Sequence, residues 1–130
     1  MIPVYRMTRQ EIQILSAVVV SWERRLYPEL NITRKEFEAT LESMERKGLL
    51  RKRKKGIEAD RIMAGIMKIM VSSERQSFGR ETELYCHNRM VILCTKDTHS
   101  EQTYRLLLFP DKNALCTTEY AKLLGGCENG

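Results

Sequence analysis

The sequence predicts an α+β fold in which N-terminal helices precede a small antiparallel sheet and a short C-terminal helix. Two capping-box sequences and a third helical apolar pattern lie before residue 72, and apolar runs of strand length follow residue 82. With 130 residues, 42% of them hydrophobic and 30% charged, the chain is long enough to bury one core. We therefore expect a single α+β domain over residues 1–126 and a frayed tail over residues 127–130.

The first helix is predicted to begin after Thr8. Thr8 and Glu11 have the spacing of a capping box, in which each side chain accepts a hydrogen bond from the other residue's backbone amide. The apolar stripe that follows at helical spacing is Ile12, Leu15, Val19, Trp22 and Leu26. We expect the helix to end near Arg25, ahead of Pro28, because proline cannot continue a helix.

The second helix is predicted from the same pattern. Thr33 and Glu36 form its capping box, and Gly48 fits the left-handed position just past its end. Its apolar stripe is Phe37, Leu41 and Met44. We expect about seven residues between the first two helices, which would then form an antiparallel helix hairpin. The residues expected to pack back under this hairpin are Leu49, Leu50 and Ile57.

A third helix is predicted over residues 59–71, where the apolar face is unusually wide. The apolar residues of this face are Ile62, Ile66 and Ile69, flanked by Met63, Met67 and Met70. We assign the methionines to the core, with a dimer interface as the alternative use of the same face. The polar residues 72–80 are expected to form a surface connector.

The second half of the chain has the composition of strands. The expected strands are residues 83–86, 90–95 and 104–109, with a short fourth strand at 114–116. A turn at residues 87–89 would join the first two as a hairpin. Continuous apolar character favours strands that are covered on both faces or central in the sheet. Residues 110–113 are expected to form a turn, and residues 117–124 a final helix that Gly125 and Gly126 stop.

The residues with chemical potential are few. The sequence contains none of the usual hydrolase, phosphate-loop, dinucleotide or zinc-protease motifs, so we expect no enzyme activity and no cofactor. Four cysteines without a C-x-x-C pair and two histidines, His87 and His99, predict no metal site. We expect free thiols in a reducing cytoplasm. The apolar run at residues 17–20 is far below the roughly 20 residues that span a bilayer, so no membrane insertion is expected.

The most specific signal is a basic run that directly follows Gly48-Leu49-Leu50. Its residues are Arg51, Lys52, Arg53, Lys54 and Lys55. The order of capped helix, Gly-Leu-Leu and basic strand over residues 8–57 resembles a winged-helix module, in which a recognition helix leads into a β-wing. The run could bind phosphates, or it could be a solvated turn or edge strand whose lysines prevent pairing.

Two observations count against a complete DNA reader. Residues 33–48 have room for only one helix, whereas a helix-turn-helix joins two helices by a tight turn. The second helix also carries Glu38, Glu42 and Glu45, acids that a phosphate-facing helix would usually avoid.

A second resemblance covers most of the chain. The capped helices at Thr8 and Thr33, the Ile/Met helix and the run from Tyr104 to Asp111 together resemble one half of the EspG-type proteins of type VII (ESX) secretion. That resemblance implies an α+β fold with a central antiparallel sheet and a non-enzymatic role as a cytoplasmic binder of secretion substrates. A homodimer would supply the missing half. We transfer no functional residues from this family.

These observations predict a non-enzymatic, cytoplasmic macromolecule-binding domain. The first function is a protein-interaction or chaperone-like module of the type VII secretion-associated kind, with a protein partner or a second copy of the chain as its ligand. The alternative is a winged-helix-like DNA-binding transcriptional regulator that uses the basic run at residues 51–55. No small-molecule substrate is evident.

Overall fold

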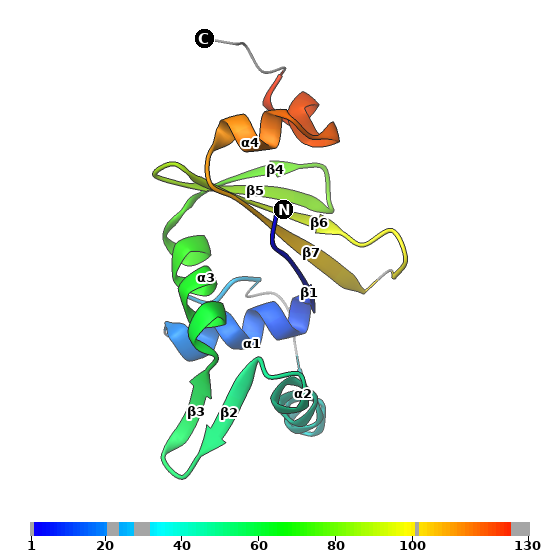
Figure 1. Ribbon diagram of the computed structural model, residues 1–130. Coiled ribbons are helices and arrows are strands. Elements are labelled where there is room, and N and C mark those ends of the chain that lie inside the picture. The colour runs from blue at the N-terminus through cyan, green and yellow to red at the C-terminus, as the bar shows by residue number, and fades with distance from the viewer. Residues whose placement is uncertain (1, 21–23, 28–31, 101, 126–130) are drawn as a thin grey trace. The chain divides into compact units, whose positions relative to one another are not determined.

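The computed structural model of the protein describes residues 2–20, 24–27, 32–100 and 102–125 (Figure 1). It combines helices with an antiparallel sheet and thus confirms the α+β class. The chain divides into two compact units. We call Thr8–Ser72 the helix–hairpin unit, and Met1–Met7 together with Ser73–Gly130 the sheet unit. The expectation of a single domain over residues 1–126 stays a prediction, and the tail at 127–130 lies outside the described residues.

In its described residues, the helix–hairpin unit contains three α-helices and a two-stranded antiparallel sheet. Its elements are α1 (Arg9–Val19), α2 (Arg34–Arg46), β2 (Leu50–Arg53), β3 (Gly56–Ala59) and α3 (Arg61–Ser72). Both predicted capping boxes are present. The amides of Glu11 and Glu36 donate to the hydroxyls of Thr8 and Thr33, each over 3.1 Å.

Helix α1 ends at Val19, so the prediction of an end near Arg25 is wrong. Three consecutive valines, residues 18–20, close the helix, and β-branched side chains are poor helix formers. The chain then returns along α1, where the Leu26 amide donates to Ser16 Oγ over 2.8 Å. Leu26 is buried by this return and not by a place in the helical stripe. Trp22 lies outside the described residues.

The link between α1 and α2 spans residues 20–33 and is longer than the seven residues expected. Figure 1 shows α2 end-on where α1 runs across the view, so the two helices cross. The prediction of an antiparallel helix hairpin is therefore wrong. A short link would have forced that arrangement, whereas a long one leaves the second helix free to cross.

The end of α2 follows the predicted glycine signal. Gly48 has a φ of +78°, a left-handed conformation that disfavours other residues. The Leu49 amide donates to the Met44 carbonyl over 3.0 Å, and the Gly48 amide to the Glu45 carbonyl over 3.1 Å. This is a Schellman motif, and it turns the chain directly from α2 into β2.

Helix α3 begins at Arg61 and not at residue 59, because Ala59 is the last residue of β3. The Asp60 carboxylate accepts hydrogen bonds from the amides of Ile62 and Met63 and so caps the helix. The buried side chains of α3 are Met63, Ile66, Met67 and Met70, which confirms burial of the methionines. Ile62 is 59% exposed, contrary to its predicted place in the buried face.

The sheet unit is built on five strands in the order β1-β7-β6-β5-β4. Their bounds are β1 (Val4–Thr8), β4 (Glu74–Phe78), β5 (Thr82–His87), β6 (Met90–Lys96) and β7 (Thr103–Phe109). The pairs from β4 to β7 are antiparallel. The predicted hairpin and the third strand are confirmed, and the strongly apolar β6 is the central strand. The turn takes up residues 88–89 and not 87–89, because His87 still pairs with Met90 as the last residue of β5. Strand β1 was not predicted.

The predicted connector at residues 72–80 is mostly strand β4. Glu74 pairs with Cys86 and Phe78 with Thr82. The strand lies at the edge of the sheet, and its first four residues are exposed, so it has no apolar alternation to reveal it.

The C-terminal part corrects two further predictions. Residues 114–116 belong to helix α4 (Lys112–Cys116) and not to a strand, and this helix also includes residues 112–113 of the predicted turn. The Asp111 carboxylate accepts from the Ala114 amide over 2.9 Å and caps this helix. A 3₁₀ helix, η2 (Glu119–Leu124), follows and ends at Gly125 as predicted. The buried cluster beneath α4 and η2 is Leu84, Val91, Leu93, Phe109 and Leu115.

Candidate nucleic-acid interface

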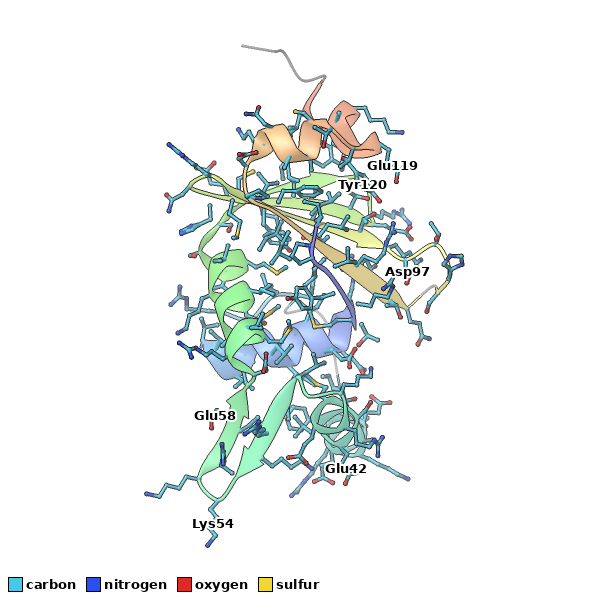
Figure 2. The ribbon with its side chains drawn as sticks, viewed as in Figure 1. Glu42, Lys54, Glu58, Asp97, Glu119 and Tyr120 are labelled. Carbon is cyan, nitrogen blue, oxygen red and sulfur yellow. The ribbon has the colours of Figure 1, made fainter. Side chains whose placement is uncertain are left out.

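The predicted basic run occupies one strand and the tip of the β2–β3 hairpin. Arg51, Lys52 and Arg53 belong to β2, and Lys54 and Lys55 form the turn. All five side chains are exposed. Figure 2 shows Lys54 extending away from the tip of the hairpin. The fold therefore presents the whole run to solvent on a rigid two-stranded element.

The hairpin is anchored at its base and closed by a glycine. Leu50 is 1% exposed, which confirms that it packs back into the unit, whereas Leu49 and Ile57 are only half-buried. The Asp60 amide donates to the Leu49 carbonyl over 2.8 Å. Gly56 has a φ of +140°, which the tight turn after Lys55 requires and other residues rarely adopt.

The pairing register divides the cations between the two faces of the hairpin. Arg51 pairs with Glu58 and Arg53 with Gly56, whereas Lys52 pairs with Ile57. Since paired residues share a face, both arginines lie on the face of Glu58 and Lys52 lies on the other. The register thus surrounds the tip with positive charge.

Two contacts tie acids to the hairpin. Arg53 Nε lies 3.0 Å from Glu58 Oε2, with side chains 55% and 63% exposed. Such an exposed pair contributes only about 0–1 kcal/mol, so Arg53 can exchange its partner for a phosphate. The Lys52 amide donates to Glu45 Oε2 over 2.9 Å and attaches the hairpin to the last turn of α2.

Two cations that the sequence analysis did not assign to the site lie beside the hairpin. A cavity of about 250 Å³ is lined by Gly48, Arg51, Glu58, Ala59, Asp60 and Arg61. A wider depression of about 610 Å³ continues along α3 and includes Arg61 and Lys68. Both side chains are exposed. The sequence signal that could have found them is a helix with two cations and no acid.

Another charged pair of the unit is structural. Glu11 is 3% exposed and accepts from the Thr8 amide over 2.9 Å. Its second carboxylate oxygen lies 2.9 Å from Lys47 Nζ. Lys47 is the C-cap residue of α2, so this pair joins the start of α1 to the end of α2.

The sheet unit has one notable carboxylate. Asp97 accepts a hydrogen bond from the His99 amide over 3.1 Å and lies 3.3 Å from Arg6 Nε. The amide hydrogen bond, with smaller help from Arg6 and Arg105, holds the pKa of Asp97 below its ordinary value. Asp97 therefore remains ionised at neutral pH and fixes its loop. His87 ends β5, and His99 is exposed in the loop after β6.

The remaining candidate ligands do not assemble into a site. Within residues 2–20, 24–27, 32–100 and 102–125, no three His, Cys, Asp or Glu side chains are grouped to hold a metal ion. Cys86 and Cys94 are free thiols as expected, whereas Cys116 is disulfide-bonded, contrary to expectation. Among the helices of the described chain, none has the length and apolar character to cross a membrane.

Comparison with known proteins gives no relative. No protein family matches the chain, and no curated protein or solved structure is detectably similar to it.

Proposed function

We propose that this protein is a non-enzymatic binding protein whose helix–hairpin unit binds the phosphate backbone of duplex nucleic acid. The observation that carries the proposal is the β2–β3 hairpin, which presents five consecutive exposed cations, Arg51 to Lys55. Clustered lysines and arginines neutralise phosphates and release the counterions condensed on a duplex. Glu58 is the one acid of the hairpin.

A duplex is favoured over a single strand because the hairpin, residues 50–59, has no aromatic side chain on which bases could stack. Proteins that bind single strands stack bases on exposed aromatic side chains. In the described part of the helix–hairpin unit, the aromatic residues are Tyr27, which is 3% exposed, and Phe37, which is half-buried. Arg9 also lies over the Tyr27 ring, 4.5 Å from its centroid. The hairpin therefore offers charge and no stacking platform.

Binding through phosphates alone carries little sequence information. Helix α2 directly precedes the hairpin, as the recognition helix of a winged-helix module precedes the wing. The exposed surface of α2 carries Glu38, Glu42 and Glu45. We therefore propose a sequence-tolerant interaction and not a regulator that reads bases with α2.

The second candidate function is the protein-interaction module of the type VII secretion-associated kind. Its support is the antiparallel pairing of β4 to β7, since the EspG resemblance implies a central antiparallel sheet, together with the edge strand β4. An extended peptide or a second copy of the chain could add a strand beside β4. A stable dimer, or capture of a protein without nucleic acid, would favour this function.

The experiment that tests the proposal is fluorescence anisotropy of a labelled random-sequence duplex over a series of salt concentrations. Each neutralised phosphate contributes about −0.9 to the slope of log K against log salt, so we expect a slope of about −4 or steeper. A parallel titration with single-stranded nucleic acid of the same length should give weaker binding. Absence of duplex binding even at low salt would contradict the proposal and leave the protein-interaction function.

A further inference from the structure

We infer that the duplex lies across the hairpin and the exposed face of α3, where it contacts Arg61 and Lys68, and that α2 faces away from it. This inference rests on the proposed function and names the rest of its interface. The arrangement departs from that of a winged-helix module, in which the helix ahead of the wing enters the groove.

The two helices beside the hairpin differ in charge. Helix α2 carries four exposed glutamates and three exposed cations, a net charge of −1; these residues are Glu36, Glu38, Glu42, Glu45, Arg34, Lys35 and Arg46. Helix α3 contains no acidic residue, and its two cations, Arg61 and Lys68, are both exposed. The net charge is thus −1 on α2 and +2 on α3, so a polyanion is favoured on the α3 side of the hairpin over the α2 side. In Figure 2, Glu42 lies on the β2 side of the hairpin, whereas Glu58 lies on β3, the strand that leads into α3.

The positions of the cations make a continuous track. Arg51 of the hairpin and Arg61 of α3 line one cavity, and Arg61 and Lys68 line the depression beside it. Arg61, Gly65 and Lys68 follow one another at four and three residues, so they share one face of the helix. The buried side chains of α3, from Met63 to Met70, occupy the opposite face.

The two acids next to this track are already engaged. Glu58 is paired with Arg53 over 3.0 Å. The Asp60 carboxylate accepts the amides of Ile62 and Met63 at the start of α3. In the protein without nucleic acid, both carboxylates are held by contacts of their own. When Arg53 turns to a phosphate, the exposed Arg53–Glu58 pair is lost at a cost of only about 0–1 kcal/mol.

Gly65 lies between Arg61 and Lys68 on this face of α3 and has no side chain that would project between them. A Cβ built on Gly65 would have no heavy atom within 4 Å, so packing within the fold does not require a glycine here. Glycine in a helix interior costs about 1 kcal/mol relative to alanine. An open surface at Gly65 lets a phosphate strand approach Arg61 and Lys68 together.

The test compares two double variants that remove the same charge. Arg61→Gln with Lys68→Gln removes the cations of α3, and Arg34→Gln with Lys35→Gln removes two exposed cations of α2. For the α3 variant, which lacks two phosphate contacts, we expect a loss of duplex affinity of roughly 100-fold near 0.1 M salt and a salt slope shallower by about 2. The α2 variant should keep the affinity and slope of the unmodified protein. Circular dichroism melting of both variants checks that each is folded.

The possible outcomes separate this inference from the proposed function. Equal binding by the α3 variant and the unmodified protein, or a loss confined to the α2 variant, would overturn the inference while duplex binding itself stands. A protein that binds no duplex would overturn both. An α3 variant that melts early is replaced by Lys68→Gln alone, for which we expect a slope shallower by about 1.

Discussion

Replacing Lys52 and Lys54 together by glutamate should abolish duplex binding and leave the fold intact. Each phosphate contact is worth close to tenfold in affinity near 0.1 M salt, because its counterion is released into that salt. Reversing two charges removes two contacts and adds repulsion, so we expect a loss of at least about 100-fold. Fluorescence anisotropy against the random-sequence duplex measures this loss.

The fold should survive because neither side chain supports it. Both lysines are exposed, and the hydrogen bond from residue 52 to Glu45 uses the backbone amide. The matched control is Lys112→Glu with Lys122→Glu, which makes the same charge change on exposed residues of the sheet unit. We expect this control to bind nearly as the unmodified protein does. Unchanged affinity in the hairpin variant would show that the basic run is not the phosphate site.

Replacing Lys47 by methionine should destabilise the protein by about 2 kcal/mol. The change leaves the buried Glu11 carboxylate without its cation, and breaking a fully buried pair costs about 3–5 kcal/mol. We place the expected value below that range because the Lys47 side chain is 53% exposed and water screens the pair. Urea unfolding followed by circular dichroism measures the free energy of unfolding.

A second substitution isolates the cause of this loss. Glutamine can serve at the third position of a capping box, so Glu11→Gln keeps the cap at Thr8 and removes the charge. The double variant Glu11→Gln with Lys47→Met has no buried charge without a partner at this place. It should therefore be more stable than the single variant Lys47→Met. Equal stability of the lysine variant and the unmodified protein would show that this pair contributes nothing to the fold.

The starts of α1 and α2 could be predicted from the sequence because their chemistry is local. The hydroxyls of Thr8 and Thr33 accept hydrogen bonds from backbone amides three residues further on. The end of α2 is also local, because the left-handed backbone of Gly48 lets the next amides bond the last carbonyls of the helix. The end of α1 could not be predicted, because it depends on a chain return that places Leu26 against Ser16. Strand β4 could not be predicted because it has no apolar pattern of its own. It is a strand because it pairs with β5.

The candidate site was predicted only where its residues are consecutive. The five cations from Arg51 to Lys55 form an uninterrupted run, so their exposure and charge could be read directly. Arg61 and Lys68 join them through the return of β3 along β2, which brings Arg61 to the cavity of Arg51. The sequence indicates only that this helix has two cations and no acid, and it does not indicate that the helix lies beside the hairpin.

The measurement that tests the central claim most directly is the binding footprint of a short duplex on the amide NMR spectrum of the isotope-labelled full chain. We predict that the amide resonances of residues 51–55 and 61–68 shift progressively as duplex is added. The amide resonances of the sheet unit, and those of α2 ahead of its last turn, should not shift. Shifts confined to the sheet unit or to the exposed face of α2, with the hairpin amides unchanged, would contradict the claim.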